Sequence, residues 1–190
     1  MGKHKRAIAF QQKALTISEE IEPENKQSIA TKYNNIGASW SDLGEYLKAH
    51  IALSKALKIR QDIFGSMHPE VARSLSNLGE TLSNLGRHQE AIDKLQKALK
   101  IRENYSHTNP LAVANTCYNL GHAYIRSGDN LKAISHFERA LVIACKTLGQ
   151  KHSRTNDYDV SLCTQLKNEG KSEAEIMKYY QEMFKRWQNL

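Results

Sequence analysis

The sequence predicts an all-α fold in which antiparallel helix pairs stack into an α-solenoid. Three observations lead to this prediction: the chain repeats itself every 42 residues, apolar residues within each period follow helical spacing, and glycines separate two helices in each period. A chain of 190 residues suits one ordinary domain or a short array of repeats. Its 40% hydrophobic and 25% charged residues exclude disordered and low-complexity classes.

Four columns of identical residues establish the repeat. Two glycine columns, one asparagine column and one alanine column keep the period through three successive units. Their members are Gly37, Gly79 and Gly121; Gly44, Gly86 and Gly128; Asn35, Asn77 and Asn119; and Ala49, Ala91 and Ala133. Chance does not produce so many matching columns, and each unit must bury its apolar face against its neighbours.

The repeat divides residues 1–190 into segments of a single array. Residues 3–21 match only the second half of the repeat, so we expect one helix there. Full repeats are expected at 29–65, 70–106 and 111–149. Residues 154–190 keep the apolar spacing but lack the asparagine and alanine columns, as terminal repeats with a different outer face do. We therefore expect a degenerate capping repeat whose last helix covers the open end.

Each full repeat is predicted to be a helical hairpin. In the second repeat, Leu75 and Leu82 share one face of the first helix, and Leu95 and Leu99 share one face of the second. The glycine between the two runs ends the first helix at a left-handed position. Pro69 falls at the start of a first helix, where its missing N–H does no harm.

Small residues and aromatic residues predict how the helices pack. The Gly37 and Ala49 columns lie where the paired helices approach most closely. We expect four aromatic side chains in the core, because their spacing matches that of leucines in sister repeats. These are Tyr33, Trp40, Tyr124 and Phe137.

These residues resemble the tetratricopeptide repeat. Ile36-Gly37, Leu78-Gly79 and Leu120-Gly121, each followed by a large residue, a glycine and the alanine column, carry the resemblance. The usual period is about 34 residues, whereas the long stretch from Ile59 to Ala72 is similar to the repeat of kinesin light chains. The resemblance implies a right-handed superhelix whose first helices line a concave groove that binds peptides.

Asparagine supplies the first column of candidate binding residues. Asn35, Asn77 and Asn119 recur in a polar stripe along the first helices. Because an amide both donates and accepts hydrogen bonds, such a ladder can hold the backbone of an extended peptide. The resemblance to kinesin light chains implies that these amides face the groove. The alternative, compatible with the first, is that each amide ties one hairpin to the next by bonding backbone groups.

Arginine supplies the second column. Arg60 and Arg102 lie near the ends of second helices, where the resemblance implies that they help to hold acidic peptides, and their fork of donors suits carboxylates. The alternative is a cation that only interacts with the helix dipole and solvent. Together with Arg73 and Arg126, these arginines predict a mildly basic groove that selects an acidic ligand.

The sequence argues against several other functions. Without HExxH, Walker A, GxGxxG or GxSxG motifs, we expect no enzyme activity, no cofactor and no metal site. The net charge of +7 is interleaved with glutamates instead of forming one basic stripe, so nucleic acid is not an expected partner. No apolar run suits a membrane span, and three cysteines without CxxC spacing or a signal peptide predict a cytoplasmic location.

The sequence therefore predicts a non-enzymatic module for protein–protein interaction that binds an extended, acidic peptide in its groove. Two alternatives stay open. The chain could be a structural or sensor scaffold within a larger signalling protein, or it could form a homodimer through its terminal helices.

Overall fold

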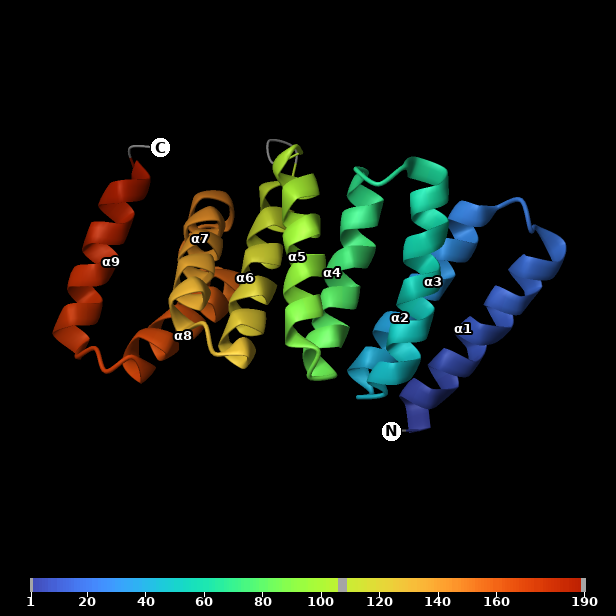
Figure 1. Cartoon of the computed structure of the whole chain (residues 1–190), viewed down its shortest axis with the longest axis horizontal. Coiled ribbons are helices and arrows are strands. Elements are labelled where there is room, and N and C mark those ends of the chain that lie inside the picture. Colours follow the sequence, from blue (N-terminus) through green and yellow to red (C-terminus); the bar gives the residue numbers. More distant parts are fainter. Residues whose placement is uncertain (1, 106–108, 189–190) are drawn as a thin grey trace. The chain divides into compact units, whose positions relative to one another are not determined.

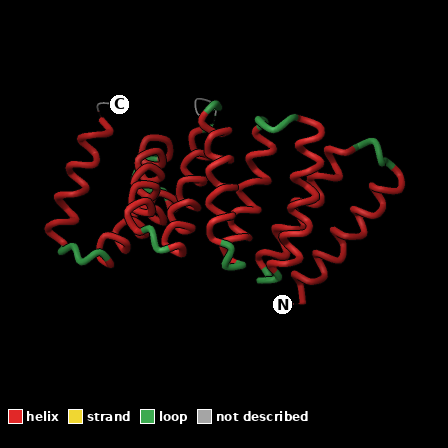
Figure 2. The backbone as a smooth tube through the Cα atoms, viewed as in Figure 1, coloured by secondary structure: helices red, strands yellow, loops and turns green. Residues whose placement is uncertain are grey.

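The computed structural model describes residues 2–105 and 109–188, which form nine α-helices and no strand (Figures 1 and 2). Their bounds are α1 (Gly2–Ile21), α2 (Lys26–Asp42), α3 (Tyr46–Phe64), α4 (Pro69–Asn84), α5 (His88–Glu103), α6 (Pro110–Ser127), α7 (Asn130–Leu148), α8 (Ser153–Asn168) and α9 (Glu173–Gln188). The helices belong to two compact units, Met1–Ile101 and Arg102–Leu190. The boundary falls inside α5, so the last residues of that helix are described with the second unit.

The first unit contains α1, the hairpin α2–α3 and the hairpin α4–α5. Helix α3 packs against α2 of its own hairpin and against α4 of the next, and α1 packs against α2 in the same way. The core therefore lies between alternating first and second helices. Its larger cluster joins α3, α4 and α5 through Leu53, Leu57, Val71, Ala72, Leu75, Leu78, Leu82, Ala91, Ala98 and Ile101.

The second unit contains the hairpins α6–α7 and α8–α9. Helix α7 packs against both α6 and α8. Three side chains of this unit, Phe137, Leu162 and Met183, are fully buried. Helix α9 is held on α7 by Glu138, whose carboxylate accepts hydrogen bonds from Tyr179 Oη (2.6 Å) and Trp187 Nε1 (2.8 Å). That α9 caps the end of the array stays a prediction.

Local signals end and begin the helices where the sequence predicts. Gly128, directly after α6, has φ of 86°, the left-handed value that favours glycine. Pro69 begins α4 and Pro110 begins α6. Close approach of paired helices is also confirmed: a Cβ atom on Gly79 would lie 2.7 Å from Leu95 Cγ and 3.2 Å from the Ala91 carbonyl oxygen.

The aromatic residues divide between core and surface. Phe137 and Tyr124 are buried, as predicted. Tyr33 and Trp40 are only partly buried where they pack against a cluster from α1, α2 and α3, so the prediction that they lie in the core is wrong in part. The buried members of that cluster are Leu15, Ile29, Ile36 and Ala52. Leu75 and Leu82 take their places in the next repeat and are buried. The larger rings of α2 instead stand beside an open cavity.

Candidate functional site

The asparagine column of the first unit lies on two neighbouring first helices, α2 and α4. Asn35 is exposed on α2, and Asn77 is half-buried on α4. Asn77 Nδ2 donates a hydrogen bond to Asn34 Oδ1 at 3.2 Å, which ties α4 to α2. The tie joins two side chains, whereas the alternative hypothesis expected a bond from a side chain to the backbone. One amide N–H and the amide oxygen of Asn77 remain for other partners.

In the second unit the same column is represented by Asn119, half-buried on α6. Here a different pair joins the first helices, because Tyr158 on α8 donates a hydrogen bond to Asn115 on α6. Within the residues that the structure describes, the side chains of Asn35 and Asn119 make no hydrogen bond. Their amides are therefore available at the surface of α2 and α6.

Two of the predicted arginines lie at the surface of first helices. Arg73 is exposed on α4, and its Nη2 lies 2.5 Å from Glu70 Oε2, so part of its charge is already paired. Arg126 is exposed in the last turn of α6. Burial of His122, one turn earlier, and secondarily the positive charge of Arg126 lower the pKa of that imidazole. The histidine is therefore mainly neutral at pH 7, and the arginine supplies the cation.

Arg60 lies in the interior, which corrects its predicted role. It is 1% exposed. Its Nη1 donates to Asn34 Oδ1 at 3.1 Å and to Ser74 Oγ at 2.5 Å, and its Nη2 lies 3.3 Å from Glu70 Oε2. Burial and the neighbouring charge of Arg73 lower its pKa to about 10, so it remains a cation at neutral pH. Arg60 holds α2, α3 and α4 together and cannot select a ligand from this position.

Arg102 makes the corresponding contacts in the second unit. Its Nη1 donates to the Ala112 carbonyl at 2.9 Å and to the Thr116 hydroxyl, and burial lowers its pKa. In both units the arginine reaches a hydroxyl residue 14 positions later. The pairs Arg60–Ser74 and Arg102–Thr116 are visible in the sequence as a shared spacing, which is the signal that could have predicted an internal tie instead of a ligand contact.

Two further features bear on the chemistry of the described residues. No three His, Cys, Asp or Glu side chains among them come close enough to hold a metal ion. None of their helices combines the length and the apolar character needed to cross a bilayer.

The repeats match a known family over most of the chain. Two family models of the tetratricopeptide repeat match residues 28–104 and 114–147, which together make up more than half of the chain. The chain belongs to the tetratricopeptide repeat family, and the fold defines a module for protein interaction. No curated protein sequence matches the chain.

Solved structures of other proteins contain similar repeats. BtubC (BKLC) from P. vanneervenii is 29% identical, with a TM-score of 0.70 over 78% of this chain and 59% of its own. A putative kinesin light chain of Podosopora anserina with nearly identical TPR-like repeats is 18% identical, with a TM-score of 0.76 over 100% of this chain and 90% of its own. The chain therefore spans less than two thirds of BtubC.

A third structure extends the likeness beyond kinesin light chains. A Rap protein complexed with Competence and Sporulation Factor is 19% identical, with a TM-score of 0.77 over 98% of this chain and 51% of its own. Together these neighbours confirm the predicted all-α tetratricopeptide solenoid with repeats like those of kinesin light chains.

Proposed function

We propose that the exposed face of the first helices binds an extended, acidic peptide. Each unit carries its own such surface, which we call its first-helix face: α2 and α4 build it in the first unit, and α6 and α8 build it in the second. In the proposal, Asn35 and Asn77 of the first unit and Asn119 of the second bond peptide backbone, while Arg73 in the first unit and Arg126 in the second select for acidic residues. The observation that carries the proposal is the pair of open amides on adjacent helices, Asn35 on α2 and Asn77 on α4.

The amides suit a backbone ligand for a chemical reason. A peptide in extended conformation presents N–H and C=O groups alternately, and an asparagine side chain can bond either kind. Asn77 uses one N–H on Asn34 and keeps its remaining donor and acceptor. Because that bond also fixes the orientation of the amide, little side-chain entropy is lost when a peptide binds.

The charge of the face favours acidic ligands. Arg73 is exposed beside Glu70, which also lies near the buried Arg60, so one carboxylate is shared by two guanidinium groups. A ligand carboxylate can therefore complete the neutralisation of Arg73. The net charge of the chain, +7, adds a longer-range attraction for an acidic partner.

A structural neighbour supports ligand binding by an array of this fold: the Rap protein was solved in complex with Competence and Sporulation Factor. The absence of enzyme activity and a cytoplasmic location form part of the same proposal. The competing candidate is self-association, which is supported by three exposed apolar residues on α1. These are Phe10, Ile17 and Ile21.

Fluorescence anisotropy with labelled acidic peptides tests the proposal. We expect Asn35→Ala to weaken binding about 2-fold to 10-fold, the range that one lost hydrogen bond accounts for, and Arg73→Glu to weaken it further. Asn104→Ala, an exposed amide outside the first-helix face, is the matched control. Affinity should also fall as salt rises.

The same experiment decides between the two candidates. If Asn35→Ala and Arg73→Glu leave every peptide affinity unchanged while the chain sediments as a dimer that Phe10→Asp dissociates, self-association replaces the proposal. If the chain stays monomeric and both substitutions weaken peptide binding, the proposal holds.

A further inference from the structure

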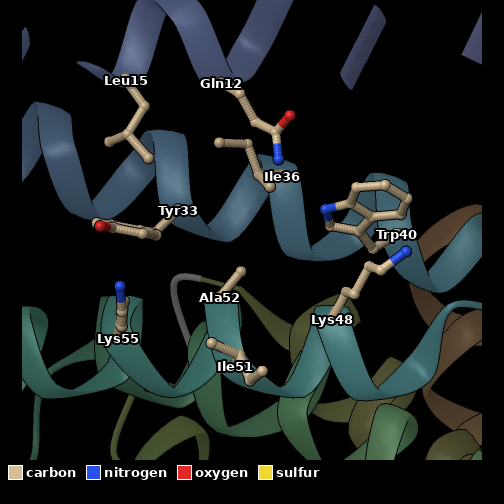
Figure 3. A pocket seen from close by; sticks show the side chains of 9 residues that line it. All are labelled: Gln12, Leu15, Tyr33, Ile36, Trp40, Lys48, Ile51, Ala52 and Lys55. Carbon is tan, nitrogen blue, oxygen red and sulfur yellow. The ribbon is translucent and has the colours of Figure 1, made fainter. Parts of the chain in front are cut away.

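A second open feature of the first unit lies on the side of α2 away from Asn35. It is a cavity of about 330 Å³ between α1, α2 and α3, and we call it the α1–α3 hollow (Figure 3). Its floor is apolar, formed by Leu15, Ile36 and Ala52, which are all buried. The rings of Tyr33 and Trp40 form one wall. Because the hollow is separate from the first-helix face, a ligand can bind here whether or not the proposed function is correct.

The rim of the hollow includes an apolar side chain that solvent reaches. Ile51 on α3 lines the cavity and is 59% exposed. A large exposed apolar side chain at the edge of an apolar cavity leaves unfavourable contact with water that a partner can remove. Figure 3 shows Ala52 pointing toward Ile36 across the opening, while Ile51 lies over the ribbon of α3.

The hollow is a property of this hairpin and not of the repeat. One period later, α5 carries Asp93 where α3 carries Ile51, and Lys94 where α3 carries Ala52. On α4, the leucines that replace Tyr33 and Trp40 are buried in a closed core. Packing of the repeat therefore needs neither the exposed isoleucine nor the two rings.

Two lysines mark the ends of the hollow. Lys48 Nζ lies 4.6 Å from the centroid of the Trp40 ring, and Lys55 Nζ lies 5.1 Å from the centroid of the Tyr33 ring. The two residues are seven positions apart on α3, about 10 Å along the helix axis. An ammonium group above an aromatic ring is held near the cavity mouth, where it can meet an anionic group. Glu45, 3.2 Å from Lys48, is itself half-exposed and easily displaced.

The shape of the hollow fits a helix. The residues that α3 contributes, Lys48, Ile51, Ala52 and Lys55, follow the spacing i, i+3, i+4 and i+7 over two turns. Those of α2 also extend over two turns. A trough of this length, bordered by α1 and α3, matches the ridge of side chains along one face of another helix.

We propose that the α1–α3 hollow binds an acidic amphipathic helix of a partner protein. One large apolar side chain of that helix enters between the rings of Tyr33 and Trp40 and covers Ile51. Carboxylates about one turn to either side of it bind Lys48 and Lys55. A second copy of this chain is a poorer occupant, because its net charge of +7 opposes approach to two lysines.

A labelled helical peptide of about 16 residues, rich in alanine and glutamate with one central phenylalanine, is the probe. Its glutamates stand four positions before and three positions after the phenylalanine. Two control peptides carry alanine in place of phenylalanine, or a central proline that breaks the helix. Binding is measured by fluorescence anisotropy and by the indole N–H signals of Trp40 and Trp187, of which only the first should shift.

Substitutions on α3 test the site itself. We expect Ile51→Asn to weaken binding about 10-fold or more, as for a central anchor, and Lys55→Glu about 5-fold. The matched controls are Leu47→Asn, which alters a still more exposed apolar residue of α3 outside the cavity, and Lys97→Glu, which reverses an exposed charge one period later. Neither control should change the affinity, and Asn35→Ala should leave it unchanged as well.

Several outcomes overturn the inference. Equal binding of the proline peptide would show that the hollow takes an extended segment instead of a helix. Equal losses with Leu47→Asn and Ile51→Asn would show a non-specific apolar contact. A dimer in the absence of peptide that Ile51→Asn dissociates would identify a second copy as the occupant. Failure of the helical peptide to bind at low ionic strength would exclude the site altogether.

Discussion

Arg60 in the first unit and Arg102 in the second stand 42 residues apart and occupy the same place in the repeat, but different groups satisfy them. Arg60 bonds two side chains, Asn34 and Ser74, with the carboxylate of Glu70 nearby. Arg102 bonds the carbonyl of Ala112 and the hydroxyl of Thr116. At the position where the first unit provides the Glu70 carboxylate, the second unit provides the backbone carbonyl of Ala112.

This difference shows which part of the arginine contact the repeat keeps. A guanidinium carries five N–H donors in a fixed fork, so it can hold neighbouring helices together through whichever acceptors the local sequence offers. The period keeps the donor and the hydroxyl partner, while the third partner varies. The first unit therefore depends on side chains that a substitution can remove, and the second depends partly on a carbonyl that no substitution removes.

The largest expected effect comes from removing these arginines. We expect Arg60→Ala to lower the free energy of unfolding by about 3 kcal/mol, because it leaves the buried Ser74 hydroxyl without its guanidinium donor and removes one of the two hydrogen bonds to Asn34 Oδ1. Arg102→Ala should cost less, about 2 kcal/mol, since Arg102 is only partly buried and the Thr116 hydroxyl keeps its own hydrogen bond to the Ala112 carbonyl. Urea unfolding followed by circular dichroism measures both. A cost for Arg102→Ala equal to that for Arg60→Ala would remove the distinction between the two units.

Close helix contacts provide the next comparison. A Cβ atom on Gly121 would lie 2.6 Å from Phe137 Cδ1 and 2.8 Å from its Cζ, whereas one on Gly79 would meet mainly Leu95 Cγ at 2.7 Å. A rigid ring can yield less than a leucine. We expect Gly121→Ala to cost about 2–3 kcal/mol and Gly79→Ala about 1–2 kcal/mol, after partial compensation by helix propensity.

Thermal and urea unfolding of these two variants test that ranking. The matched substitution is identical in both units, so only the neighbouring side chain differs. The double variant Gly121→Ala with Phe137→Leu should recover part of the loss if the ring is the obstacle. If the double variant is no more stable than Gly121→Ala alone, the loss of stability comes from the backbone and not from the Phe137 ring.

The units should also differ in their response to pH. Burial lowers the pKa of His122 and His136 in the second unit, whereas in the first unit burial lowers the pKa of His50. A histidine whose folded pKa is lowered binds fewer protons than in the unfolded chain, so its contribution to stability is complete above the unfolded pKa of about 6.5 and is lost as pH falls from there through the lower folded pKa. Carboxyl groups, whose ordinary pKa is about 4, change their charge little between pH 7.5 and pH 5.5.

We therefore expect the second unit to lose more stability than the first between pH 7.5 and pH 5.5. Hydrogen exchange, followed by mass spectrometry of peptides from each unit, measures the two losses separately. His136→Gln should reduce the pH dependence of the second unit. Equal losses of stability in both units would contradict the prediction that His122 and His136 make the second unit more sensitive to pH.

The sequence was sufficient for the helices, because helical spacing, the glycines and Pro69 are local signals that act within one hairpin. It was not sufficient to predict that Arg60 is buried and bonds neighbouring helices. Whether a residue at the end of a second helix meets solvent or a neighbour depends on how the next hairpin folds over it, and Ser74 lies on that hairpin. Helical periodicity within one element does not carry this information.

The partly open surroundings of Trp40 were missed for a related reason. The sister residue Leu82 is buried, and equal spacing suggested equal burial. Spacing reports the direction of a side chain but not the volume left by its neighbours. Comparing α3 with α5 could have shown the difference, because Ile51 and Ala52 on α3 correspond to charged residues on α5.

The smallest predicted effect distinguishes the two asparagines that the proposed function treats alike. Asn77→Ala removes the hydrogen bond to Asn34 and should lower the free energy of unfolding by about 1 kcal/mol. Asn119→Ala should change it by less than about 0.5 kcal/mol, since Tyr158 and Asn115 join the first helices of the second unit. If both amides bind ligand, however, both variants must weaken peptide affinity. Urea unfolding and fluorescence anisotropy on the same two variants therefore separate the structural role of each asparagine from its binding role. If only Asn77→Ala lost affinity, that loss would follow from its disturbed packing, and the proposal that both asparagines bind ligand would be wrong.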